Sequence, residues 1–330
     1  ATEPNTAHIH GIGLHTEDYY RMTRERAQLI WSPRSNMSLY GHTANVTNFA
    51  EFGGVIALGT DWTYSGSIHM GRELACADLL NKEYYNEQLS DRLLWEMSTI
   101  NGAIATGTET KLGTLETGKT ADIAVFDGTV APHYRAIIEM GPEGAALVLR
   151  AGTPLYGEPA IVSTLGASCE ALSVCGAERA LCSIQEYGID FDAIQASIPD
   201  AYPAFFCEES PLYEPTCIPS HPGEFTGART DEDIDGDGID NDTDNCPALF
   251  NPIRPIDGGT QPDADGDGNG DACDETPLPA DIDADGTLND DDNCPFTANE
   301  NQADSDGDNK GDACDKCPDT PNPDSICPEV

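Results

Sequence analysis

The sequence predicts an α/β fold in its first 157 residues and an irregular repeat structure without an apolar core from residue 229 to the end. Three observations support this. Short apolar runs alternate with amphipathic stretches over residues 8–110. Residues 111–157 contain short strand-like runs separated by Gly and Pro. In the last part, acidic residues recur at a fixed spacing with few apolar residues between them.

The first apolar runs are expected to form a parallel sheet. They cover residues 8–14, 28–32 and 54–60, and they are almost continuously apolar, which is typical of strands buried on both faces. Helices are expected at 16–27, 43–52, 71–82 and 91–100, the last capped by Ser90. Three strands are too few for a closed barrel, which needs eight.

Two further regions separate this unit from the acidic repeats. Residues 111–157 predict a small β-rich unit with strands at 121–127, 136–140 and 145–151. Residues 158–228 hold five cysteines and seven prolines, so we expect a compact disulfide-stapled connector with a short helix near 177–187. The expected domains are therefore 1–110, 111–157, 158–228 and 229–330.

Charge and cysteine content restrict the function and the compartment. The net charge is −43, and 30 of the 59 acidic residues lie from Asp231 onward, which argues against nucleic acid or anionic lipid as partners. Twelve cysteines, of which only Cys76 precedes residue 160, predict disulfides and a secreted, periplasmic or cell-surface protein. We expect Cys76 itself to be a free, buried thiol. No run of 18 apolar residues predicts a membrane span, and the start at Ala1 suggests processing or truncation.

One acidic cassette occurs four times after residue 229. Each copy has Asp at positions 1, 3, 5 and 12 and Gly at position 6, which Asn309 replaces in the fourth copy. Alternate carboxylates that converge around a sharp turn are the oxygen ligands that Ca²⁺ prefers. The expected calcium ligands are Asp233, Asp235, Asp237, Asp244, Asp263, Asp265, Asp267, Asp274, Asp281, Asp283, Asp285, Asp292, Asp304, Asp306, Asp308 and Asp315.

The fuller pattern is Asp-Asn-Cys-Pro from Asp244 and Asp292, with Gly-Asp-Ala-Cys-Asp from Gly270 and Gly311. It resembles thrombospondin type 3 repeats. The resemblance implies a calcium-packed rod with the disulfides Cys246–Cys273, Cys294–Cys314 and Cys317–Cys327. If the rod is a stalk, removal of Ca²⁺ is expected to loosen residues 229–330 and expose them to protease while the barrel half of the chain stays intact. The alternative is a disordered acidic tail that chelates weakly.

Three consecutive strands of the first unit end in polar side chains. His10 stands at the end of the first strand, within the run at 8–14, and Asn36 and Asp61 follow the second and third apolar runs. In parallel α/β proteins the carboxyl ends of the strands face the active site, so we expect the three side chains to meet. A single strand-end Asp can also cap a helix, and a single His can be structural.

The same segments resemble the C-terminal half of an amidohydrolase-superfamily enzyme. The resemblance rests on Trp-Ser-Pro-Arg-Ser-Asn at 31–36, Gly-Thr-Asp-Trp at 59–62, Ser-Gly-Ser at 65–67, and residues 113–125. It implies the last three strands of a (β/α)8 barrel, strands 6–8, beside a small β-sandwich. It further implies hydrolysis of a C–N or related bond in a small-molecule substrate by water activated on Zn²⁺ or Fe²⁺. Asp61 and His10 would be catalytic residues and metal ligands, and Asn36 and Trp62 would shape the substrate pocket.

The chain departs from this family in one respect. The family's His-x-His pair and its other metal ligands from the earlier strands are absent. One Asp and one His cannot hold a catalytic zinc, which needs at least three protein ligands. We therefore expect an N-terminal half of the barrel elsewhere, as a separate chain after cleavage, as further residues, or in a partner. The alternative function is a non-catalytic scaffold in which the calcium rod mediates assembly.

Overall fold

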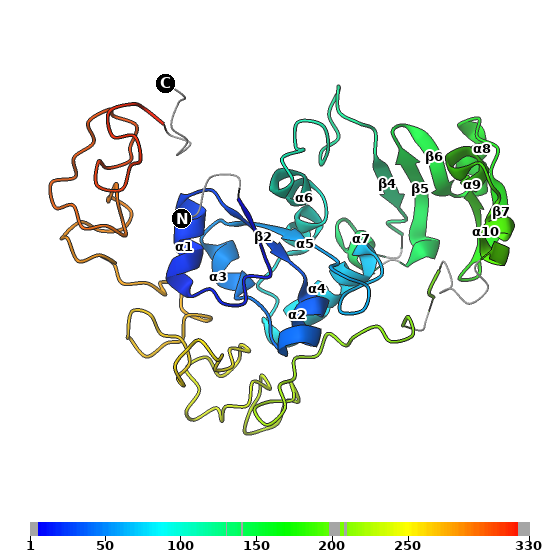
Figure 1. The fold of residues 1–330 in the computed structure, drawn as a ribbon. Coiled ribbons are helices and arrows are strands. Elements are labelled where there is room, and N and C mark those ends of the chain that lie inside the picture. Colours follow the sequence, from blue (N-terminus) through cyan, green and yellow to red (C-terminus); the bar gives the residue numbers. More distant parts are fainter. Residues whose placement is uncertain (1–5, 130, 140, 198–204, 208–209, 323–330) are drawn as a thin grey trace.

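The computed structural model describes residues 6–129, 131–139, 141–197, 205–207 and 210–322. Two sheets organise the first 181 residues. One is a three-stranded parallel sheet in the order β1-β2-β3, and the other is a five-stranded antiparallel sheet in the order β4-β5-β6-β8-β7. The parallel sheet lies near the middle of the molecule and the antiparallel sheet at its right end in the view, with helices between them (Figure 1).

The parallel sheet contains the three expected strands in sequence order: β1 (Ala7–Ile9), β2 (Gln28–Trp31) and β3 (Val55–Leu58). Helix α1 (Thr16–Arg24) connects the first two strands, and α2 (Pro33–Tyr40) and α3 (Val46–Glu51) connect the next two. Helix α2 was not expected. Its start at Pro33 and its end at Gly41, which has a φ of 79°, are ordinary helix signals.

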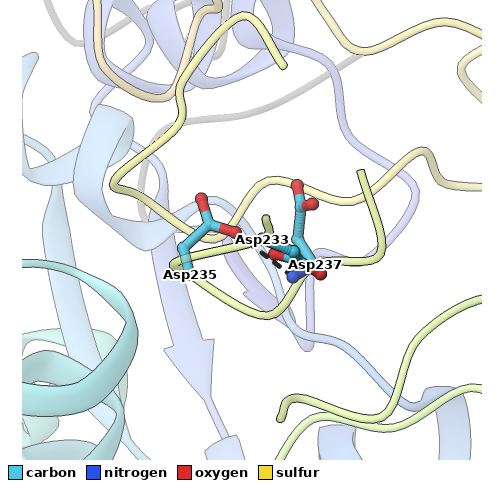
Figure 2. A group of neighbouring side chains, drawn as sticks. All are labelled: Asp233, Asp235 and Asp237. Carbon is cyan, nitrogen blue, oxygen red and sulfur yellow. Dashed lines mark hydrogen bonds between the residues drawn. The ribbon is translucent and has the colours of Figure 1, made fainter. Parts of the chain in front are cut away.

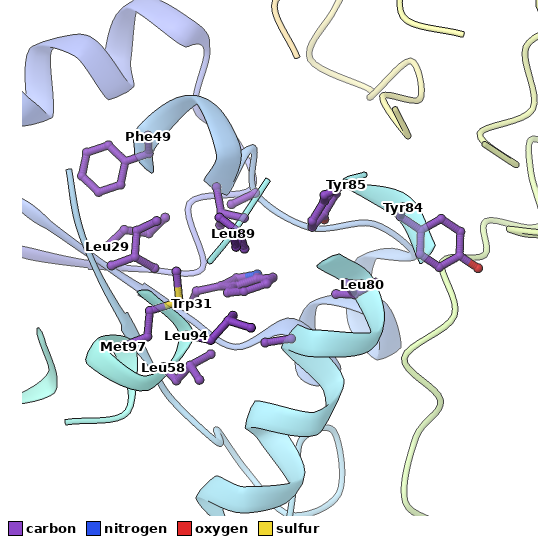
Figure 3. Packing of buried hydrophobic residues seen from close by; sticks show 14 of the residues in the cluster. Leu29, Trp31, Phe49, Leu58, Leu80, Tyr84, Tyr85, Leu89, Leu94 and Met97 are labelled. Carbon is purple, nitrogen blue, oxygen red and sulfur yellow. The ribbon is translucent and has the colours of Figure 1, made fainter. Parts of the chain in front are cut away.

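Helices after β3 complete the core of this unit. They are α4 (Met70–Tyr84), α5 (Asp91–Met97) and α6 (Ile100–Ala105), and the Ser90 side chain caps α5 as predicted, since it accepts from the backbone N–H of Leu93. Fully buried side chains from β2, α3 and α4, including Leu29, Phe49 and Leu80, pack together (Figure 3). The central strand is therefore covered on both faces, while Ile9 on β1 is 62% exposed.

The antiparallel sheet contains β4 (Ile123–Phe126), β5 (Ala145–Arg150), β6 (Thr153–Gly157), β7 (Glu170–Val174) and β8 (Ala177–Leu181). The expected strand at 136–140 is instead helix α7 (Arg135–Glu139), because a short apolar run fits either structure and tertiary packing decides. The expected helix at 177–187 is strand β8 followed by α9 (Ser183–Tyr187).

Cys175 and Gly176, with φ of 51° and 81°, form the tight turn that makes β7 and β8 a hairpin. Single-turn or two-turn helices complete the region: η1 (Pro142–Gly144), α8 (Pro159–Thr164) and α10 (Phe191–Ser197).

Five disulfides join the described residues. Two confirm the pairs implied for the repeats, Cys246–Cys273 and Cys294–Cys314. The connector cysteines pair as Cys169–Cys182 and Cys175–Cys207. Cys76 is not a free thiol, because it is bonded to Cys217, whose 141-residue separation hides the pair from local sequence patterns. The expected partner of Cys317, Cys327, lies outside the described residues.

The repeats are docked on the parallel unit. Residues 229–322 contain no helix or strand. The chain returns from the antiparallel sheet past α2, and the repeats lie beside α1 (Figure 1). Phe225 and Phe250 belong to the same buried cluster as Leu29. No helix in the described part of the chain combines the length and hydropathy that a membrane crossing requires.

Candidate functional site

His10 lies in a tight turn at the carboxyl end of β1. Its φ is 69°, which is uncommon for a residue with a side chain, and the N–H of Gly11 donates to the carbonyl of Ile9 across it. The N–H of His10 donates to the carbonyl of Ile30 on β2. Such strain costs about 1–3 kcal/mol and is concentrated at functional sites. The turn directs the imidazole toward α2 and β3.

Asn36 fixes the orientation of the imidazole. Its Oδ1 lies 2.9 Å from Nδ1 of His10, and its Nδ2 donates to Oγ1 of Thr43 at 2.8 Å. Trp31 Nε1, which can only donate, uses the same threonine oxygen at 2.7 Å. With Asn36 held in this way, its Oδ1 is the acceptor, so in the neutral imidazole Nδ1 of His10 is the donor and Nε2 has the lone pair. The sequence predicts Asn36 in the wall of the substrate pocket, but the structure buries it completely behind His10.

Asp61 follows β3 and faces His10. Its Oδ2 lies 3.7 Å from Nε2 of His10, and both side chains are only partly exposed. Its φ of 55° makes it a second strained residue at a strand end. Ser35 Oγ donates to the same carboxylate oxygen at 2.5 Å and lies 3.2 Å from Ser65 Oγ. Ser35 is a site residue that sequence reasoning missed, although it lies within the motif at 31–36.

The loop after Asp61 is closed by backbone hydrogen bonds and carries two exposed aromatic rings. Backbone N–H groups of Gly66 and Ser67 donate to the carbonyls of Trp62 and Thr60. A Cβ atom at Gly66 would lie 1.9 Å from the Thr60 carbonyl oxygen, so only glycine allows this closure. Trp62 is 65% exposed and Tyr64 is 76% exposed, and their ring centroids lie 4.7 Å apart.

The side chains at this site are of the types that bind a catalytic metal, but there are fewer of them than such a metal needs. A neutral imidazole Nε2 whose other nitrogen is hydrogen-bonded, next to a carboxylate, is the arrangement that zinc ligands adopt. Catalytic zinc needs at least three protein ligands. Within the described ranges, the groups of three or more potential ligands are all in the acidic repeats. Within the described residues, His10 and Asp61 supply two facing donor groups of the kind that hold zinc, 3.7 Å apart.

The four acidic repeats form four similar loops: loop 1 (233–244), loop 2 (263–274), loop 3 (281–292) and loop 4 (304–315). In each, one ligand atom from the Asp residues at positions 1, 3 and 5 lies within 4.8 Å of those of the other two; Figure 2 shows loop 1. Position 6 has φ between 73° and 99°, including Asn309, as a left-handed turn requires. Its N–H donates to the position-1 carboxylate in every loop.

Loop 1 contains buried carboxylates whose negative charge and oxygen lone pairs are only partly matched by hydrogen bonds. Asp235 and Asp237 are each 2% exposed, and Oδ2 of Asp235 and of Asp244 has no hydrogen-bond partner among the described residues. Burial and the neighbouring carboxylates raise the pKa of Asp235 to about 8 and that of Asp237 to about 7. Orphaned buried oxygens of this hardness fit a calcium ion, which would remove their repulsion. Position-12 oxygens of loops 2 and 4, from Asp274 and Asp315, are orphaned in the same way.

Comparison with known proteins divides the chain into two parts. Residues 1–154 match the amidohydrolase family, and residues 227–254 and 262–302 match the thrombospondin type 3 repeat. A 5-methylthioadenosine/S-adenosylhomocysteine deaminase from Clostridium tetani is 33% identical over 124 residues, which cover 37% of this chain and 29% of that protein. A deaminase of the same name from Teredinibacter turnerae is 35% identical over 127 residues, 38% of this chain and 29% of that protein.

Among solved structures, an adenosine deaminase from Xanthomonas campestris with bound zinc is similar, with 23% identity and a TM-score of 0.42. That match covers 45% of this chain and 36% of the other. The match to the deaminases from Clostridium tetani and Teredinibacter turnerae covers less than a third of the length of each.

Proposed function

We propose that this chain, an amidohydrolase-family segment ahead of thrombospondin type 3 repeats, is the C-terminal part of an exported metal-dependent hydrolase that acts on C–N bonds. The observation that supports it best is the pair His10 and Asp61, whose facing atoms lie 3.7 Å apart at the carboxyl ends of β1 and β3. In this proposal β1, β2 and β3 are strands 6–8 of a (β/α)8 barrel. The antiparallel sheet, a single layer in the described residues, would be one sheet of the small β-sandwich beside it.

A bound Zn²⁺ or Fe²⁺ would supply a water of lowered pKa, which is a nucleophile at neutral pH. His10 Nε2 and the Asp61 carboxylate would be two of its ligands. Asp61 would also accept the proton of the attacking water, and Ser35 holds its Oδ2 in place. Among the described residues, Asp61 Oδ1 accepts no hydrogen bond, so it is the oxygen available to that water.

The remaining ligands must come from a second segment. The described residues offer two donors where three or more are needed. Strand β1 has a hydrogen-bonded neighbour only on its β2 side within the described sheet, and Ile9 at its end is 62% exposed. An unpaired strand edge with an exposed apolar side chain is a surface for another strand. We therefore propose the N-terminal half of the same barrel as the partner, on the same or a separate polypeptide.

The proposed substrate is an amine on a planar heteroaromatic ring. Deaminases named for adenine-containing substrates are the relatives reported above. Trp62 and Tyr64 place two exposed rings directly after Asp61, where a purine could stack. Water would replace the exocyclic amine, the ring carbon would become a carbonyl, and ammonia would leave.

We propose that the repeats bind calcium and that the protein works outside the cytoplasm. The five disulfides favour an oxidising compartment. The converging carboxylates of the four loops favour an environment rich in Ca²⁺.

Complementation tests the catalytic proposal. The chain is co-expressed with the part of the Clostridium tetani deaminase that precedes the matched segment, and ammonia release from 5-methylthioadenosine is measured with zinc present. We expect activity from the pair, none from either part alone, and loss on Asp61→Asn in the pair. A folded, zinc-loaded complex that is inactive, or equally active with Asp61→Asn, would instead support the non-catalytic scaffold.

A further inference from the structure

The repeats and the α/β unit share a buried polar contact. Thr16 Oγ1 at the start of α1 donates to Asp271 Oδ2, and Asn48 Nδ2 on α3 donates to the backbone carbonyl of Asp271 at 2.5 Å. All three residues are at most 3% exposed. The second carboxylate oxygen of Asp271 accepts from the N–H of Ala264, inside loop 2. Asp271 therefore links loop 2 to α1 through its carboxylate and to α3 through its backbone carbonyl.

An apolar contact lies beside it. Phe250 packs edge-on against Tyr84 of α4 and against Phe225, with ring centroids 5.4 Å apart in both pairs. The N–H of Phe250 donates to the carbonyl of Tyr84, and the Tyr84 hydroxyl donates to the carbonyl of Gly227. Phe225 and Phe250 are each 6% exposed and belong to the core of the α/β unit. The repeats, through Phe250, and the segment just before them, through Phe225, therefore supply part of that core.

Loop 1 holds the segment that carries Phe250. The N–H of the next residue, Asn251, donates to Asp237 Oδ2 at 3.3 Å. Gln261 Nε2 donates to Asp244 Oδ1 at 2.7 Å and to the Asn251 carbonyl. The carboxylates of loop 1 thus arrange residues on both sides of the core contact. Their mutual repulsion opposes this arrangement unless a cation lies between them.

A third contact reaches the turn that follows His10. Arg254, held by an ion pair with Asp257 at 2.8 Å, donates from Nη1 to the carbonyl of Leu14 at 2.9 Å. The Tyr19 hydroxyl donates to the carbonyl of Gly11, next to His10. The segment between His10 and α1 is therefore held from the repeat side as well.

We propose that Ca²⁺ in loops 1 and 2 docks residues 225–274 onto α1, α3 and α4, and that this interface is a structural part of the α/β unit. Calcium then stabilises the hydrolase-like unit itself. This contradicts the expectation of a stalk that loosens alone. The inference does not depend on any hydrolytic activity, and its tests measure structure.

The first test uses the full chain with Ca²⁺ or with excess EGTA. Hydrogen exchange of peptides from α1, α3 and α4 is measured together with the thermal midpoint. We expect EGTA to increase exchange in these helices at least tenfold and to lower the midpoint. Unchanged protection of the helices while residues 225–322 lose theirs would overturn the proposal.

The second test separates the loops. Asp235→Asn with Asp237→Asn neutralises loop 1, and Asp306→Asn with Asp308→Asn is the matched change in loop 4. We expect the loop 1 variant to expose α3 and α4 in the presence of Ca²⁺ and the loop 4 variant to leave both helices protected; α1 is not used for this comparison, because Lys310 of loop 4 pairs with Glu25 at its end. Equal effects of both variants would contradict a specific interface.

A third variant keeps the test decisive if the loop 1 protein does not fold. Thr16→Val removes the hydroxyl that meets Asp271 and leaves every loop intact. Because coupling between two sites is reciprocal, we expect this variant to need several-fold more Ca²⁺ to reach full protection of residues 225–274. An unchanged calcium midpoint would overturn the coupling.

Discussion

Asn36 Oδ1 lies 2.9 Å from Nδ1 of His10, on the side of the imidazole opposite Asp61. The amide is itself held by Thr43, which also receives the indole N–H of Trp31. This network selects one imidazole tautomer and leaves Nε2 free to face the carboxylate. Asn36 is therefore a positioning residue, since its side chain is fully buried.

The first prediction concerns Asn36→Leu, which keeps the volume and removes both hydrogen bonds. We expect metal affinity and ammonia release by the complemented enzyme to fall about 10–100-fold, as for other groups that orient a ligand. Nitrogen-15 NMR would show His10 changing from one tautomer to a mixture. Asn36→Asp retains an acceptor and is expected to keep the tautomer. If Asn36→Leu leaves the tautomer unchanged, Asn36 does not orient the ring.

The second prediction concerns the exposed rings beside Asp61. Replacement of Trp62 or Tyr64 by Ala removes stacking worth about 0.5–1.5 kcal/mol. We expect the KM for a purine substrate to rise about 2–10-fold with little change in kcat, because a platform binds substrate and transition state alike. Leu115→Ala, at an equally exposed apolar residue far along the chain, is the control. A large fall in kcat at constant KM would assign the rings another role.

The third prediction concerns Glu73, which is fully buried on α4. Its Oε1 accepts from the N–H of Arg34 at 3.1 Å, and Oε2 has no partner among the described residues. Burial raises the pKa of Glu73 to about 7, from an ordinary value of 4.5. The folded state therefore holds this proton more tightly than the unfolded state. Its contribution to stability is complete below about pH 4.5 and is lost as the pH rises through about 7.

Glu73→Gln imitates the protonated carboxyl at every pH. We expect the variant to be more stable than the parent at pH 8 by about 3 kcal/mol, because the rise of the pKa from 4.5 to about 7, which already includes the opposing effect of Arg34, corresponds to about 1.4 kcal/mol per pKa unit. The difference should vanish near pH 4.5. Urea unfolding at the two pH values measures it, and Glu87→Gln at an exposed site is the control. Parallel pH profiles for parent and variant would show that Glu73 ionises freely in the folded protein.

Local patterns predicted the elements that form the site. The apolar runs at 28–32 and 54–60 are β2 and β3, and the residues that follow them lie at one edge of the sheet. His10 and Asp61 meet because the carboxyl ends of parallel strands point the same way. The acidic loops could also be predicted, because their geometry depends on the spacing of Asp and Gly over only a few residues.

Contacts between distant segments were not predictable. Thr16 and Asp271 are 255 positions apart, and neither belongs to a motif that indicates the other. The acidic composition of the repeats suggested an isolated rod, whereas Phe250 of the repeats and Phe225 just before them both pack into the core of the α/β unit. Helix α7 differs from its expected strand for the same reason, since Ile138 packs into that core. Tertiary packing decides what short apolar stretches do.

The fourth prediction concerns Cys76–Cys217, which joins α4 to the segment that returns from the antiparallel sheet. Other contacts hold the same segment. Arg72 Nε donates to both carboxylate oxygens of Glu214 at 2.6 and 2.8 Å, and the N–H of Ser220 donates to the carbonyl of Gly41. We therefore expect the double variant Cys76→Ala with Cys217→Ala to fold and to keep these contacts between the returning segment and the α/β unit.

The disulfide acts mainly on the unfolded chain. A cross-link across 141 residues removes more unfolded-state entropy than Cys169–Cys182, which spans 13. We expect the double variant to lose about 4–5 kcal/mol of unfolding free energy and the Cys169→Ala, Cys182→Ala control to lose about 3 kcal/mol. Urea unfolding of both proteins with Ca²⁺ present measures the difference. If both double variants lose the same unfolding free energy, the Cys76–Cys217 bond does not restrict the unfolded chain more than the short disulfide does. The contact between Arg72 and Glu214 would then already confine the returning segment in the unfolded chain.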